Sequence, residues 1–129
     1  MSVGAVTISG ARPGMLARLY STLLGWPYIR EEPPAPGAPA GTGYASVCPP
    51  DGVDGMALNF EYDAHYRQPT WPSVAGEQVI TQHLDVGVRD LDSAVEWALQ
   101  CGATLATYQP SDNHRVLIDP DGHPFCLCR

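Results

Sequence analysis

The stretch that decides the fold is QHLDVGVRDLDSAVEWALQCGA, residues Gln82 to Ala103. Its first part alternates between apolar and polar residues, which predicts a strand over Thr81 to Val88. One side of that strand is formed by Leu84, Val86 and Val88, and the other carries His83 and Asp85. The second part predicts a helix.

That helix is expected to run from Leu91 to Cys101, with Asp90 as its N-cap and Gly102 as the residue that ends it. Three more strands are predicted after it, over 104–108, 113–118 and 124–128. The DPDG sequence at 119–122 is typical of a turn between the last two strands.

The first half of the chain shows the same order of elements. A strand over 3–9 precedes a helix that begins at Pro13 and ends at Gly25. Further strands are predicted over 26–30, 44–48 and 56–62. Residues 33–43, PPAPGAPAGTG, are too rich in proline and glycine for regular structure and are expected to form a loop.

Each half is therefore a βαβββ module, and the sequence predicts an α+β fold. The modules are expected at residues 1–62 and 80–129, joined by a linker over 63–79, within one domain that spans 1–129. A lone module leaves one face of its sheet uncovered. Two modules can curl their mixed sheets around a cleft while the helices cover the outer faces.

Composition excludes several functional classes. The net charge is −7, and all seven basic residues are arginine. An acidic surface repels phosphate backbones and anionic lipid, so we expect no nucleic-acid or membrane partner. The N-terminus lacks the features of a signal peptide, and no run of about 18 apolar residues exists. The four cysteines show no CxxC spacing and are expected to be reduced thiols in the cytoplasm.

Several segments resemble glyoxalase-like proteins of the vicinal-oxygen-chelate superfamily. Gln82 to Ala103 resembles the start of that family's second module, and RVLIDPDGHPFCLC, Arg115 to Cys128, resembles its close. LARLYSTLLGW, Leu16 to Trp26, is similar to the first helix, and PTWP at 69–72 to the linker of one subgroup. The resemblance implies the glyoxalase/bleomycin resistance/dioxygenase fold, a homodimer and a small-molecule ligand in the cleft.

Catalytic members of the superfamily hold a divalent metal with His, Glu or Gln side chains, two from each module. His83 stands at the first-strand ligand position of the second module, and Glu61 (or Asn59) lies near the last-strand position of the first. Cys126 replaces the usual glutamate, and the first strand offers only Ala5 or Thr7. We therefore expect no complete metal site. If a metal binds, His83, Glu61 and Cys126 would hold it, and the thiolate would favour zinc.

Seven residues are expected to contact a ligand in the cleft: His83, Asp85, Glu61, Tyr44, Trp71, Cys126 and Arg115. His83 and Glu61 are the candidate catalytic residues, and Asp85 is close enough in sequence to orient the His83 imidazole. The alternative is a hydrogen-bonded polar patch without chemistry, with Asp85 paired to Arg115 and the cysteines acting as small buried side chains.

Two functions fit this pattern. The first is binding of a small organic ligand without any cofactor, as in the bleomycin-sequestering relatives. The second is an enzyme, either a metal-dependent lyase, isomerase or dioxygenase or a metal-free acid–base catalyst that uses His83. The incomplete metal set and the aromatic residues near strand ends favour the first.

Overall fold

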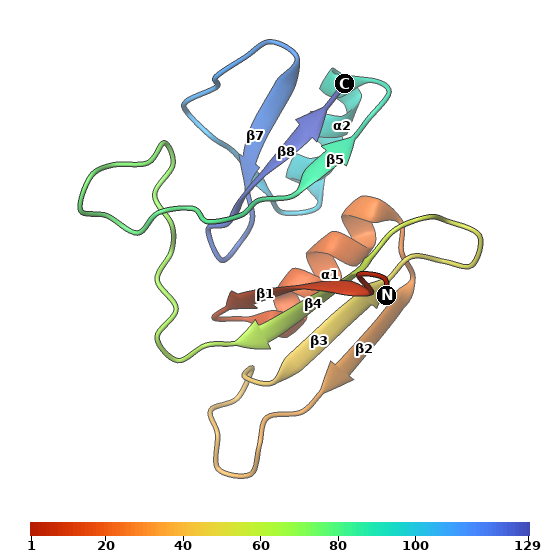
Figure 1. Cartoon of the computed structure of the whole chain (residues 1–129), viewed down its shortest axis with the longest axis vertical. Helices are drawn as coiled ribbons and strands as arrows, with labels where there is room; N and C mark the ends of the chain where they lie inside the picture. The colour runs from red at the N-terminus through yellow and green to blue at the C-terminus, as the bar shows by residue number, and fades with distance from the viewer. The chain divides into compact units, whose positions relative to one another are not determined.

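The structure is a computed structural model that describes all 129 residues. The chain forms two compact units, Met1–Tyr66 and Arg67–Arg129, called unit 1 and unit 2 below. Each unit consists of one four-stranded mixed sheet and one helix (Figure 1). No helix is long and apolar enough to cross a membrane.

Unit 1 has the predicted order of one strand, one helix and three strands. Its elements are β1 (Ala5–Gly10), α1 (Pro13–Leu24), β2 (Tyr28–Glu32), β3 (Tyr44–Cys48) and β4 (Ala57–Tyr62). The strand order in the sheet is β1-β4-β3-β2, in which β1 runs parallel to β4 and the other neighbours are antiparallel. The first strand of the unit therefore lies beside the last.

Helix α1 covers one face of this sheet. Its apolar side is buried at Leu16, Leu19 and Tyr20, and the Tyr20 ring stacks on Phe60 of β4 with ring centroids 5.5 Å apart. The helix ends at Gly25, which adopts the left-handed conformation with φ 67° and donates its backbone N–H to the last turn. The predicted start and stop of this helix are both found in the structure.

The face of the unit 1 sheet that points away from α1 is polar. Cross-strand register places Thr7, Asn59 and Ser46 in one row, and Ser9, Glu61 and Tyr44 in the next. We call this helix-free side of each sheet its open face. Because side chains alternate along a strand, these residues point away from Phe60 and its buried neighbours.

Unit 2 repeats the topology of unit 1. Its elements are β5 (Asp85–Gly87), α2 (Leu91–Gln100), β6 (Thr104–Leu105), β7 (His114–Ile118) and β8 (Pro124–Cys128). The strand order is β5-β8-β7-β6, and β5 runs parallel to β8. Two βαβββ units with mixed sheets confirm the predicted α+β fold.

Both faces of the unit 2 sheet carry apolar side chains. Leu117, Phe125 and Leu127 are fully buried on the side that α2 covers. On the open face, Ala106, Val116 and Cys126 form a separate buried cluster, against which Trp71 packs. Helix α2 begins at its predicted N-cap, where Asp90 accepts a hydrogen bond from the Ser93 N–H at 2.8 Å. Hydrogen bonds from Ser93 hold the pKa of Asp90 below its usual value.

Two strands of unit 2 are shorter than the sequence predicted. The strand expected over 81–88 is regular only over Asp85–Gly87, so His83 precedes β5. The strand expected over 104–108 ends at Leu105. Beyond it, the Gln109 side chain makes hydrogen bonds to the Val116 backbone that a continued strand would make. Its amide donates to the carbonyls of Ala106 and Val116 and accepts from the Val116 N–H at 2.8 Å.

Replacing Gly25 with alanine tests the left-handed end of α1. No atom lies within 4 Å of a Cβ built at Gly25, so the cost comes from the backbone alone. We expect Gly25→Ala to lower the free energy of unfolding by about 1 kcal/mol, measured from urea denaturation curves. Gly4→Ala is the matched control, because Gly4 also has free space but no positive φ. Equal stability of the two variants would contradict this account.

Candidate functional site

Three potential ligand side chains meet on the open face of unit 2. They are His83, Asp85 and Cys126, whose donor atoms all lie within 4.8 Å of one another. Asp85 of β5 is the register partner of Cys126 of β8, so the parallel pairing places both side chains on the same face. His83 lies two residues before Asp85, and its Nε2 is 3.2 Å from Asp85 Oδ1.

The cysteine of this cluster is a protonated thiol at neutral pH. Burial, together with the charge and hydrogen bond of Asp85, raises the pKa of Cys126 to about 11. Burial and Asp85 also raise the pKa of Cys128. Since a thiol is a nucleophile only as its thiolate, this environment disfavours nucleophilic catalysis by either residue.

His83 and Asp85 form a solvent-accessible pair. Their side chains are 48 % and 64 % exposed, so the ion pair would contribute less than about 1 kcal/mol to the free energy of unfolding. Stability therefore does not account for the placement of these residues. A histidine whose ring nitrogen contacts a carboxylate can exchange a proton with a bound molecule through its other nitrogen.

Trp71 forms an apolar wall on the same face. Its ring packs against the cluster of Ala106, Val116 and Cys126. The indole N–H donates to the Tyr108 carbonyl at 3.1 Å, and the two rings lie 6.2 Å apart. These contacts fix the indole, so the open face of unit 2 combines a rigid aromatic side chain with the polar cluster at its edge strand.

Two other predicted site residues, Glu61 and Tyr44, belong to unit 1. They are cross-strand partners on the open face of that sheet, and Glu61 accepts a hydrogen bond from the Ser9 hydroxyl at 3.2 Å. The structure does not bring Arg115 to the cluster. Arg115 is the register partner of Leu127, on the face that α2 covers, and its Nη1 donates to the carbonyls of Ser111, Asp112 and His114.

Sequence reasoning missed a second histidine–carboxylate pair. The Asp119 carboxylate is fully buried and lies 2.9 Å from Nδ1 of His123, whose side chain is 18 % exposed. Asp119 also accepts from the backbone N–H groups of Asp121 and His123. The signal was a histidine four residues after the first aspartate of the DPDG turn. The contact between these two side chains closes the turn between β7 and β8.

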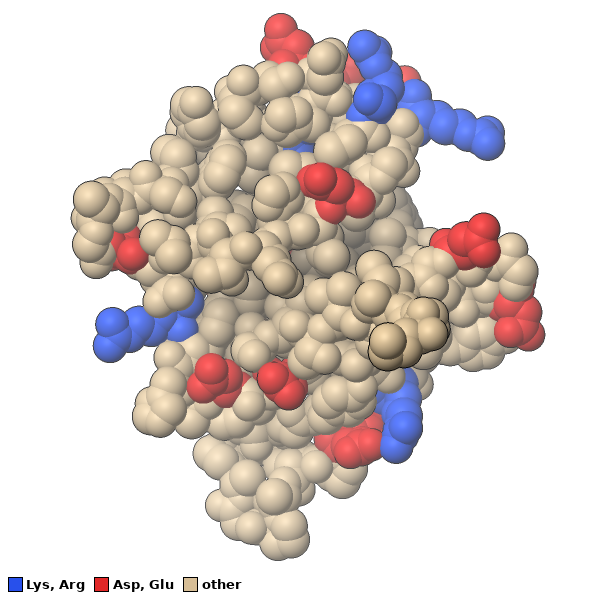
Figure 2. Space-filling view, viewed as in Figure 1, with Lys and Arg blue, Asp and Glu red and all other residues tan.

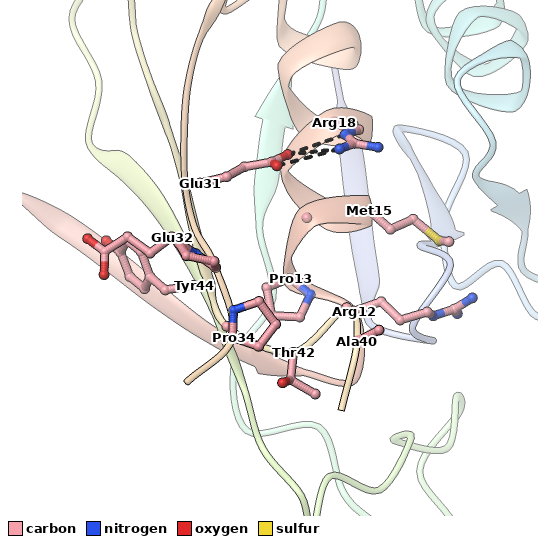
Figure 3. Close-up of a pocket in the computed structure, with 14 residues that line it drawn as sticks. Arg12, Pro13, Met15, Arg18, Glu31, Glu32, Pro34, Ala40, Thr42 and Tyr44 are labelled. Carbon is pink, nitrogen blue, oxygen red and sulfur yellow. Dashed lines mark hydrogen bonds and ion pairs between the residues drawn. The ribbon is translucent and has the colours of Figure 1, made fainter. Parts of the chain in front are cut away.

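Unit 1 contains a separate pocket of about 690 Å³ between the first turn of α1 and the loop after β2 (Figure 3). Pro13, Met15, Pro34 and Tyr44 contribute to its wall. Its prominent charged contact is the exposed pair of Arg18 and Glu31, with Nη2 3.2 Å from Oε1. The pocket brings no cluster of metal-ligating or acid–base side chains together.

Charge is spread thinly over the surface. Figure 2 shows carboxylates scattered among uncharged residues on the visible face, with few arginines between them. This distribution agrees with the net charge of −7. It offers no continuous basic surface on that face for a phosphate backbone.

The ligand set of metal-dependent relatives does not fit unit 1. Of the two residues that the first strand offers, Ala5 has no ligand atom in its side chain, and the Thr7 hydroxyl accepts a hydrogen bond from the Asn59 amide at 3.5 Å. A hydroxyl and an amide that bond to each other are poor ligands for a divalent transition metal. The only carboxylate that β4 places on this open face is that of Glu61.

Comparison with known proteins agrees with the fold. The profile of a family described as glyoxalase-like domain matches residues 5–128. Among solved structures, a glyoxalase family protein from Enterococcus faecalis aligns with a TM-score of 0.67 at 16 % identity, covering 99 % of this chain and 97 % of that one. No curated protein matches the chain in sequence.

A fosfomycin resistance protein and a glyoxalase I are also similar in structure. The fosfomycin resistance protein FosX from Mesorhizobium loti aligns with a TM-score of 0.62 at 12 % identity, covering 98 % of this chain and 90 % of that one. The trypanothione-dependent glyoxalase I of Leishmania major aligns with a TM-score of 0.59 at 16 % identity, covering 100 % and 86 %. At these identities the likeness concerns the fold alone.

The raised pKa of Cys126 predicts slow alkylation. In chelator-treated protein at pH 8, we expect iodoacetamide to modify Cys126 at least about tenfold more slowly than the exposed Cys48. The Cys126 rate should still be rising at about pH 11, because the thiol is only partly ionised at a pH near its pKa. Peptide mapping by mass spectrometry measures both rates. Asp85→Asn should speed the reaction, and equal rates at Cys126 and Cys48 at pH 8 would refute the prediction.

Proposed function

Because the chain belongs to the glyoxalase-like domain family, we propose that it binds a small organic molecule on the open face of unit 2. In this proposal the ligand lies over Cys126, stacks on Trp71 and presents a polar group to His83 and Asp85. The proposed binding does not depend on the four-ligand metal centre that the family resemblance implies. That centre would be incomplete, because the first strand of unit 1 supplies none of its usual ligands.

The observation that carries the proposal is the adjacency of two kinds of side chain on one rigid sheet. Trp71 packs against the cluster of Ala106, Val116 and Cys126, and Cys126 also belongs to the cluster with His83 and Asp85. An apolar surface with a few converging polar groups is the usual composition of a small-molecule site. The exposed pair of His83 and Asp85 adds little to the free energy of unfolding, so stability does not explain its placement, and a binding role is favoured.

The charges at the site favour a neutral or cationic ligand. Asp85 is exposed beside His83, and the chain as a whole is strongly acidic. A planar ring would stack on the indole, and a donor group on the ligand would satisfy the Asp85 carboxylate. Structural relatives named for fosfomycin resistance and for glyoxalase I support a small-molecule ligand in general, without identifying it.

Other expectations from the sequence stay predictions. They are the contribution of Tyr44, Glu61 and Arg115 to ligand binding, the action of both units as one domain with a cleft, and the homodimer. The local geometry supports Tyr44 and Glu61 more than Arg115, since the first two share an open face. The Arg115 guanidinium is already engaged with backbone carbonyls.

Substituting Trp71 tests the binding proposal. A panel of neutral and cationic heteroaromatic compounds would be screened by thermal shift, and each hit titrated by calorimetry. At about a hundred times its Kd, a ligand stabilises the folded chain by about 2.7 kcal/mol. We expect Trp71→Leu to weaken binding by about tenfold or more, which is the loss of one stacked ring.

Trp97→Leu is the matched control, because Trp97 is 44 % exposed on α2 and not part of the open face. It should leave the affinity of each hit unchanged. The proposal fails if the two tryptophan variants weaken binding equally, or if no compound in the panel stabilises the protein.

A second candidate function is metal-free acid–base catalysis. The contact of 3.2 Å between His83 Nε2 and Asp85 Oδ1 favours it, because the carboxylate orients the imidazole and leaves Nδ1 to accept a proton. In this function His83 would remove a proton from carbon next to a carbonyl group in the bound molecule and return it at the same or a neighbouring atom.

Solvent isotope exchange tests this candidate. The protein would be incubated in deuterium oxide with a panel of small α-hydroxy ketones, and deuterium incorporation next to the carbonyl group followed by NMR. An acid–base catalyst should incorporate deuterium faster than buffer, and His83→Gln should abolish the excess while retaining ligand affinity. Asp85→Asn should slow the exchange by about 10- to 1,000-fold, because the imidazole loses its orienting partner. No excess over buffer would rule out catalysis on this compound class.

A further inference from the structure

We propose that His83, Asp85 and Cys126 bind a divalent zinc-like cation in a three-ligand site built entirely within unit 2. This inference goes beyond the proposed function, which requires no metal. It also departs from the arrangement that the family resemblance implies, because it takes no ligand from unit 1 and uses Asp85 instead.

The distances between the three donors suit one ion. Zinc binds histidine nitrogen, carboxylate oxygen and cysteine sulfur at about 2.0–2.3 Å, so neighbouring donors in a tetrahedron are separated by about 3.3–3.8 Å. His83 Nε2 and Asp85 Oδ1 lie 3.2 Å apart, and all three donors lie within 4.8 Å. Small side-chain rotations around an ion would bring them to these distances.

The backbone fixes two of the donors before any ion arrives. Asp85 and Cys126 are register partners across the parallel strands β5 and β8. The Cys126 N–H donates to the Leu84 carbonyl at 2.8 Å, which locks this register. Packing of Cys126 in the cluster with Ala106 and Val116 holds its side chain still. His83, half exposed and ahead of the strand, is the adjustable third ligand and lies toward solvent, where an ion enters.

Charge and ligand type select the cation. Asp85 and a deprotonated Cys126 supply two negative charges, which a divalent cation neutralises. On binding, the Cys126 S–H bond breaks, its proton passes to solvent, and the sulfur forms a bond to the metal. A thiolate and an imidazole favour zinc or cobalt over magnesium and calcium. Three protein ligands leave a fourth position open for water or a ligand atom.

Cobalt(II) titration tests the site, because a cobalt–thiolate bond gives a charge-transfer absorption that carboxylate and imidazole ligands do not. Chelator-treated protein without an affinity tag would be titrated with Co²⁺ and then with Zn²⁺. We expect the band to saturate at one ion per chain, zinc to displace it, and about one proton to be released per ion. Absence of the band with wild-type protein would overturn the proposal.

Variants assign the ligands. Cys126→Ser should abolish the charge-transfer band, and His83→Ala and Asp85→Asn should each weaken cobalt binding strongly. His83 and Asp85 are exposed, so their variants should keep the wild-type circular dichroism and melting temperature even where Cys126→Ser does not. Cys48→Ser is the matched control for a thiol outside the site and should change nothing.

Glu61→Gln distinguishes this site from one that includes unit 1. We expect it to leave cobalt affinity and absorption unchanged, whereas a loss comparable to that of His83→Ala would overturn the proposal. The titration uses metal alone and the Trp71 experiment uses organic compounds alone. Failure of one therefore leaves the other standing.

Discussion

The parallel pairing of the first and last strands in each unit is the constraint on which the rest of the structure depends. β1 pairs with β4, and β5 with β8, while every other neighbouring pair is antiparallel. Parallel strands cannot be joined by a tight turn, so a helix and two more strands lie between them in the chain. The helix then covers one face of the sheet. The other face carries no helix in either unit, and the candidate site residues are found there.

The same pairing produces the chemistry of unit 2. Asp85 and Cys126 are 41 positions apart in the printed sequence, yet they are side by side because β5 adds to the edge of the sheet next to β8. Burial of the thiol, with the Asp85 carboxylate beside it, raises the pKa of Cys126 to about 11. The Cys126 thiol therefore keeps its proton at neutral pH, which suits hydrogen bonding to a ligand or exchange of the proton for a cation.

The sequence predicted those features that local chemistry determines. Gly25 and the Asp90 cap gave the helix limits, and alternation gave β3 and β8 with their observed bounds. The sequence also predicted that the His83 and Asp85 side chains, two residues apart, lie close together. It did not predict that β5 is only three residues long, because strand length depends on a partner. Nor could local pattern show that Gln109 ends β6 with its side chain, or that Arg115 turns toward backbone carbonyls.

Rows of side chains on the open faces of the two sheets differ in chemistry. Thr7, Asn59 and Ser46 form a row across β1, β4 and β3, and Asp85, Cys126 and Val116 form the corresponding row across β5, β8 and β7. The first row consists of hydroxyl and amide groups, among which the Asn59 amide donates to the Thr7 hydroxyl. The second pairs an ionisable carboxylate and thiol with an apolar neighbour. One topology therefore provides a row of uncharged polar groups in unit 1 and a row with two ionisable groups in unit 2. Fold similarity cannot reveal this difference, because it lies in side chains that the fold leaves unrestricted.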